Sequence, residues 1–131
     1  MRFWTYMLIM DLLVPVVLIV IGARWKENPP KEINRLHGYR TSMSMKNKDT
    51  WETAHKIYAR VSYILGLLMF VPTVSAMWKV ITATEDEISM RGNVIAIVQL
   101  VVLVLEIIYT EIRMRMLFDK NGNRRNQPKL Q

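Results

Sequence analysis

Three long apolar runs dominate the sequence. They cover residues 3–23, 61–78 and 92–112, and the charged side chains inside them are Asp11, Glu106 and Glu111. At about 1.5 Å per residue, helices of these lengths measure about 27 to 32 Å, close to the roughly 30 Å hydrocarbon core of a bilayer. The runs therefore predict an all-α membrane protein with three transmembrane helices, at about residues 3–23, 57–78 and 92–112.

Two other interpretations of the runs explain fewer features. A helix of a soluble bundle needs a polar face, and residues 12–21 and 94–105 have almost none. A cleaved signal peptide would account for Arg2 ahead of the first run, but Asp11 falls inside the run and the Ala-x-Ala pattern is missing. The sequence thus predicts a single integral membrane domain over residues 1–131.

The distribution of basic residues predicts the orientation. Nine lysines and arginines fall between residues 24 and 60, and six more follow from Arg113 onward. Because basic segments stay cytoplasmic, we expect the N-terminus outside, with the loop of residues 24–56 and the basic tail of residues 113–131 in the cytoplasm. The same bias explains the net charge of +7 without direct nucleic-acid binding.

The loop between the first two runs carries helix signals at both ends. Pro29 and Pro30 are expected to stop the first helix. Asp49 followed by Glu52 resembles a capping box, so a helix is expected to start near Asp49 and continue into the second run. One face of that helix would point over the loop and consists of Trp51, His55, Tyr58 and Ser62. Residues 119–131 are expected to form a short disordered end.

Polar residues inside the runs form a further candidate site. An ionised carboxylate at Asp11 would cost at least ~2.5 kcal/mol. Gln99 lies at nearly the same depth, so we expect the two side chains to face each other or a shared water. Glu106 is expected to pair with Arg60 or Arg40. The polar stripe of the third helix consists of Gln99, Glu106, Thr110 and Arg113. These residues would either hold the helices together, at about 1 kcal/mol per contact, or form a proton- or ion-linked site.

Metal and cofactor chemistry have little support. There is no cysteine, the histidines are His37 and His55, and neither a zinc motif nor a glycine-rich phosphate loop is present. We therefore expect no metal, no cofactor and no catalytic residue. Three spans bury little surface, so a homodimer is compatible with the sequence, although no Gly-x-x-x-Gly motif marks a dimer face.

A family resemblance lies in the first loop. The stretch Asn34-Arg35-Leu36-His37-Gly38-Tyr39-Arg40-Thr41 is followed by Ser44, Asn47, Trp51, Ala54 and His55. This order resembles the signature of the SdpI family of small bacterial membrane proteins, which reads approximately Asn-x-x-x-Gly-x-Arg-Thr, then Ser or Thr, Asn, and Trp followed by Ala and Asn or His. The resemblance implies a non-catalytic, multi-pass protein of the bacterial cytoplasmic membrane.

What the family does is implied by its named member, an immunity protein. That protein protects a Bacillus cell from its own secreted membrane-active toxin, and it holds a transcriptional repressor at the membrane when toxin is present. It also carries further N-terminal spans, whereas this sequence has the module alone. The resemblance therefore implies protection from a peptide toxin more directly than signalling through a cytoplasmic regulator.

Two roles are open for the motif residues. Asn34 and Arg40 would tie the loop onto the helix that bears Trp51 and His55, forming a packed cap. Alternatively, a loop with Gly38, Arg40 and Thr41 would offer backbone N–H groups and a guanidinium to an anion of a lipid headgroup or partner protein.

Three classes of function follow from these patterns. The first is toxin immunity, with a partner bound through residues 34–56. The second is a small transporter or accessory subunit that uses Asp11, Gln99 and Glu106. The third is a membrane enzyme with His55 or His37 as its base.

Overall fold

The structure is a computed structural model of the chain, and it describes residues 1–34 and 36–125. It consists of three long helices, α1 (Arg2–Glu27), α2 (Lys48–Trp78) and α3 (Glu85–Leu117). Their 26, 31 and 33 residues correspond to about 39, 46 and 50 Å. Each helix is long and apolar enough to cross a membrane. The predicted all-α fold with three helices of membrane-spanning length is confirmed.

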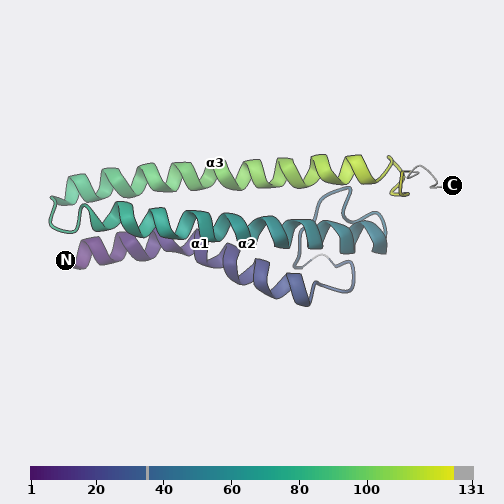
Figure 1. Cartoon of the computed structure of the whole chain (residues 1–131), viewed down its shortest axis with the longest axis horizontal. Helices are drawn as coiled ribbons and strands as arrows, with labels where there is room; N and C mark the ends of the chain where they lie inside the picture. The colour runs from purple at the N-terminus through teal and green to yellow at the C-terminus, as the bar shows by residue number, and fades with distance from the viewer. Residues whose placement is uncertain (35, 126–131) are drawn as a thin grey trace.

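The helices run alternately up and down, so that α2 is antiparallel to α1 and α3 (Figure 1). The loop after α1 (residues 28–34 and 36–47) and residues 118–125 after α3 lie at one end of the bundle, here called the loop end. The N-terminus and the short turn of residues 79–84 lie at the other end, the turn end. As predicted, α1 stops just before Pro29 and Pro30.

Close backbone contact joins α1 to α2. A Cβ atom added to Gly22 of α1 would lie 2.6 Å from the Tyr63 nitrogen and 2.7 Å from the Ala59 oxygen of α2. Backbone atoms cannot move aside easily, so only glycine allows the two helices to approach this closely. Small residues at such crossings are typical of helices that associate within a bilayer.

Buried polar groups concentrate in the middle of the bundle, and two apolar clusters lie at its ends. At the turn end, the apolar cluster consists of Trp4, Met77, Val80 and Ile88. At the loop end, it consists of Tyr39, Ala54, Met114 and Phe118. Between them the buried residues include Asp11, Ser62, Thr73, Gln99, Glu106 and Thr110, while large apolar side chains such as Val20, Leu68 and Val101 point outward. This distribution suits a bundle surrounded by lipid, because the outer surface needs no polar groups.

Candidate functional site: the motif loop and the polar interior

Residues 28–47, here called the motif loop, fold back over the first turns of α2. The turn begins at Asn34, whose side-chain oxygen accepts hydrogen bonds from the Leu36 and His37 N–H groups at 3.0 and 2.9 Å. Its amide nitrogen donates to the Glu32 carbonyl at 3.1 Å. Asn34 therefore shapes the loop locally through these three bonds. The predicted bond from Asn34 to α2 is not among them. Arg35 lies outside the described residues.

Gly38 brings the loop into contact with α2. Its φ angle is +112°, a conformation that L side chains rarely adopt. An added Cβ would lie 2.7 Å from His55 Nε2 and 3.0 Å from the Trp51 ring. Both the backbone conformation and the close approach thus require glycine at this position.

His55 and Trp51 form the hydrogen bonds that hold the loop to α2. His55 Nε2 accepts from the Tyr39 N–H at 2.9 Å, so this nitrogen carries no proton, and Nδ1 donates to the Trp51 carbonyl at 2.7 Å. Trp51 Nε1 donates to the Pro30 carbonyl at 2.7 Å. Because both ring nitrogens of the fully buried His55 are engaged, this arrangement leaves no nitrogen for a catalytic base.

Tyr39 connects the motif loop to both α2 and α3. Its ring stacks on Tyr58 of α2, with 4.8 Å between centroids, and its hydroxyl donates to Glu111 of α3 at 2.9 Å. Burial, together with the hydrogen bond to the Glu111 carboxylate, raises the pKa of Tyr39 well above its ordinary value. The Tyr39 phenol therefore stays neutral and links the loop to both α2 and α3.

Thr41 and Ser44 form a compact turn after Tyr39. The Ser44 hydroxyl accepts from the Thr41 N–H at 2.8 Å and donates to the Tyr39 carbonyl at 2.9 Å. The Ser44 N–H in turn donates to the Thr41 hydroxyl at 3.2 Å. The N–H groups of Tyr39 and Thr41 are thus used within the protein. Two backbone donors in the stretch that we expected to face an anion are therefore occupied. The Arg40 side chain lies at the surface.

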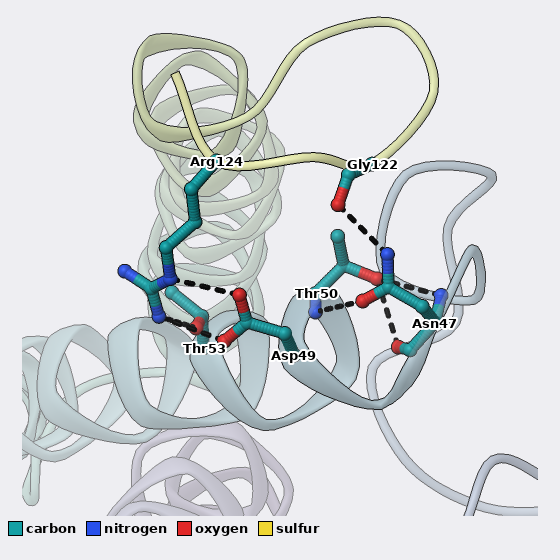
Figure 2. Close-up of polar contacts among 6 residues, drawn as sticks. All are labelled: Asn47, Asp49, Thr50, Thr53, Gly122 and Arg124. Carbon is teal, nitrogen blue, oxygen red and sulfur yellow. Dashed lines mark hydrogen bonds and ion pairs between the residues drawn. The ribbon is translucent and has the colours of Figure 1, made fainter. Parts of the chain in front are cut away.

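Asn47, the next motif residue, caps the start of α2 (Figure 2). Its side-chain oxygen accepts from the Thr50 N–H at 2.9 Å, and the Asn47 N–H donates to the Thr50 hydroxyl at 3.0 Å. The predicted start of the helix near Asp49 is confirmed, but the predicted capping box of Asp49 and Glu52 is wrong. Asn47 takes the cap because it lies one residue before the helix, where a side-chain oxygen reaches the third N–H.

The chain beyond α3 folds back onto the same turn of α2. Asn47 Nδ2 donates to the Gly122 carbonyl at 2.7 Å, and the Arg124 guanidinium holds both Asp49 oxygens at 2.7 and 2.8 Å (Figure 2). Phe118 is fully buried beneath this segment. The expectation of a disordered end is therefore wrong for residues 119–125, while residues 126–131 lie outside the described residues.

Sequence reasoning missed these tail contacts although two signals were present. Asn121, Gly122 and Asn123 are turn-forming residues, and Gly122 adopts a φ of +80°. Phe118 is an aromatic residue directly before that turn. Together they are typical of a chain that reverses direction and packs.

A basic pocket lies where the motif loop, α3 and the tail meet. It has a volume of about 370 Å³, and its charged lining residues are Lys46, Glu111, Arg115, Asp119, Lys120 and Arg125. Its four cations outnumber its two carboxylates, so the pocket favours an anion. It lies beside the packed motif, and its cations come from residues outside the motif.

Asp11 and Gln99 contact each other in the interior, but through the backbone of Asp11, whereas the prediction concerned its carboxyl group. Gln99 Nε2 donates to the Asp11 backbone carbonyl at 2.8 Å and to the Thr73 hydroxyl at 3.3 Å. The amide of Gln99 therefore joins all three helices. The Asp11 carboxyl is directed elsewhere, toward Gly92 of α3, and its Oδ2 has no hydrogen-bond partner among the described residues.

Glu106 lies closer to the loop end and contacts α2. Its Oε1 accepts from the Ser62 hydroxyl, and its Oε2 has no hydrogen-bond partner in the described part of the chain. The predicted pairing with Arg60 or Arg40 is wrong. Arg113, the last residue of the predicted polar stripe, is exposed. The buried residues of α3 are four positions apart here, at Glu106, Thr110 and Met114, so Met114 faces inward in its place. Within residues 1–34 and 36–125, no three His, Asp or Glu side chains group to hold a metal ion.

The helices and the buried polar groups together define a class of protein. Three helices of bilayer length, with an apolar outside and buried polar groups, form a multi-pass membrane protein. Comparison with known families then identifies it further. The model of the SdpI/YfhL protein family matches residues 31–110, which is more than half of the sequence, and the chain belongs to this family. The resemblance seen in the loop is thereby confirmed.

A curated relative is the uncharacterized protein YfhL of Bacillus subtilis (strain 168). It is 36% identical over 53 residues, which cover 40% of this chain and 48% of that protein. The matched segment thus spans about half the length of this relative. No solved structure matches the chain.

Proposed function

We propose that this protein is an immunity protein of the bacterial cytoplasmic membrane that protects its cell from a membrane-active peptide toxin. Membership of the SdpI/YfhL family and the three helices of membrane-spanning length support the proposal. In the proposed orientation, the loop end faces the cytoplasm. The concentration of basic residues in the motif loop and after α3 supports this orientation.

The observation that carries the proposal is how the motif loop is built. The loop is held against the helices by Gly38, Tyr39, Asn47, Trp51 and His55. Ser44 fixes its internal turn. A loop fixed in this way keeps one surface shape, and a preorganised surface loses less entropy when it binds a partner. The exposed Arg40, at the centre of the motif, and the adjoining basic pocket are the proposed contact surface for a cytoplasmic regulator.

Survival of toxin-sensitive bacteria tests this proposal. Cells would express the wild type, Arg40→Ala or Leu36→Ala, with membrane abundance measured by immunoblot, and be exposed to membrane-active peptide toxins. Leu36 is the matched control because it is in the same loop and 91% exposed. We expect protection by the wild type and Leu36→Ala and its loss in Arg40→Ala at equal abundance. Equal survival with the wild type and with an empty vector would contradict the immunity role.

A second candidate is a small transporter or accessory subunit, and the two buried carboxyl groups favour it. Asp11 and Glu106 are 4% and 1% exposed, and each has one oxygen without a hydrogen-bond partner among the described residues. Buried carboxyl groups inside a membrane are expensive and commonly serve ion or proton movement. This candidate predicts that Asp11→Asn abolishes function while the protein still folds. A fully functional Asp11→Asn variant would remove it.

A further inference from the structure

A groove on the outer face of the bundle lies between α2 and α3. It has a volume of about 390 Å³, and its lining residues are Val61, Ile64, Leu65, Val102, Leu105, Glu106 and Tyr109. This volume lies within the range of small-molecule sites, roughly 300 to 1,000 Å³. The walls are apolar, and Glu106 is the single carboxyl among the lining residues.

The Glu106 carboxyl lacks a complete set of partners. One oxygen accepts from Ser62, and the other has no partner among the described residues, although the side chain is 1% exposed. The titratable groups that face it are the phenols of Tyr58 on α2 and Tyr39 in the motif loop, and Tyr109 lines the same groove. The described residues of α1 add no charge interaction with Glu106. None of these neighbours supplies a positive charge.

A carboxyl group in these surroundings is stable in two states. It can hold a proton, or it can lose the proton when another cation takes its place, because an unpaired carboxylate in apolar surroundings is strongly disfavoured. A ligand that replaces the proton must be positive, to match the carboxylate, and must carry apolar substituents, to fill the walls. It must also reach the groove from the bilayer, on which the groove opens.

We propose that this groove binds a lipophilic monocation, with an ammonium or phosphonium centre near Glu106 and apolar substituents against Val61, Leu65 and Val102. On binding, the Glu106 O–H bond breaks and the proton leaves to solvent while the cation takes its place, so the charge of the groove stays constant. The inference is independent of the immunity role. It holds whether or not the cation is carried across the membrane.

Tetraphenylphosphonium binding to the full chain in lipid nanodiscs tests this inference. Isothermal titration calorimetry would compare the wild type, Glu106→Gln and the control Glu27→Gln, which removes an exposed carboxyl at the end of α1. We expect saturable binding by the wild type and the control, and at least tenfold weaker binding by Glu106→Gln. Wild-type affinity should also fall as the pH is lowered, since protons compete, and titrations in two buffers of different ionisation enthalpy should reveal proton release.

Three results would overturn the inference. They are no saturable binding by the wild type, equal binding by Glu106→Gln, and equally tight binding of the neutral triphenylphosphine oxide, which would indicate partition into apolar surface. If Glu106→Gln does not remain monodisperse and helical, Val61→Phe replaces it, because this change fills the groove and leaves the carboxyl intact. Val61→Phe should abolish binding, and unchanged binding would be equally contradictory.

Discussion

Replacing Gly38 with alanine should release the motif loop from α2 while leaving the three helices intact. The substitution has two unfavourable effects, one on the backbone conformation and one on the packing. It forces a residue with a Cβ into a backbone conformation with φ of +112°, and it places that Cβ 2.7 Å from His55 Nε2. His55 cannot move aside freely, because it is fully buried and both ring nitrogens are hydrogen-bonded.

The magnitude follows from these two effects. A residue held in a sparsely populated backbone region costs about 1 to 3 kcal/mol. If the loop shifts to relieve the contact, the buried Tyr39 N–H loses His55 as its acceptor, which costs about 1 to 3 kcal/mol. The sum is about 2 to 6 kcal/mol. Since about 1.4 kcal/mol corresponds to a factor of ten, the opening equilibrium of the loop should rise at least roughly thirtyfold.

Hydrogen–deuterium exchange measured by mass spectrometry in nanodiscs would detect this change. Peptides that cover residues 39–44 should exchange at least roughly thirtyfold faster in Gly38→Ala, because the Tyr39, Thr41 and Ser44 N–H groups lose their acceptors. Peptides from the middle of α3 should not change. Leu36→Ala is the matched control and should behave as the wild type. Unchanged exchange over residues 39–44 in Gly38→Ala would refute the proposed packing of the loop.

Three further changes test neighbouring contacts. Asn47→Ala should destabilise the first turn of α2 by about 1 kcal/mol, the usual value of an N-cap, measured as faster exchange of residues 48–51; wild-type exchange there would count against the cap. Asp49→Asn should speed tryptic cleavage after Arg124, whereas Glu52→Gln should not, and high salt should reduce the difference because the ion pair is half exposed. Since the pKa of Tyr39 is raised, its phenol stays neutral in the folded loop when an unfolded one ionises near pH ~10. Loop stability is thus complete below that pH and declines above it, and Tyr39→Phe should remove one late-ionising phenol from an absorbance titration at about 295 nm.

The helices were predictable because their signal is local. Each run of apolar residues is long enough to cross a bilayer, and the two prolines after α1 end it through backbone chemistry alone. The comparable depth of Asp11 and Gln99 was also predictable, since the two helices run in the same direction, but the surroundings of the Asp11 carboxyl were not. The inward-facing residue near the end of α3 was not predictable. Arg113 and Met114 lie three and four residues after Thr110, and both spacings are typical of one face of a helix.

The contacts of the motif loop could not be derived from local patterns. Asn47 and Asp49 are both good caps, and only the observed first turn decides between them. Arg124 meets Asp49 across 75 residues of sequence, and the requirement for Gly38 depends on where His55 lies. Spacing along one chain does not reveal such approaches. The family motif marked the residues, but their role in packing emerged from the geometry.

In the proposed orientation, the motif loop and residues 118–125 form one assembly on the cytoplasmic face of a bacterial membrane. The natural sequence has no cysteine, so single cysteines can report the exposure of each side to a membrane-impermeant maleimide in intact cells. We expect labelling in intact cells of Met90→Cys, whose position near the turn end is 67% exposed. Leu36→Cys and Lys120→Cys should be labelled only after the membrane is permeabilised. Labelling of Leu36→Cys or Lys120→Cys in intact cells would contradict the claim.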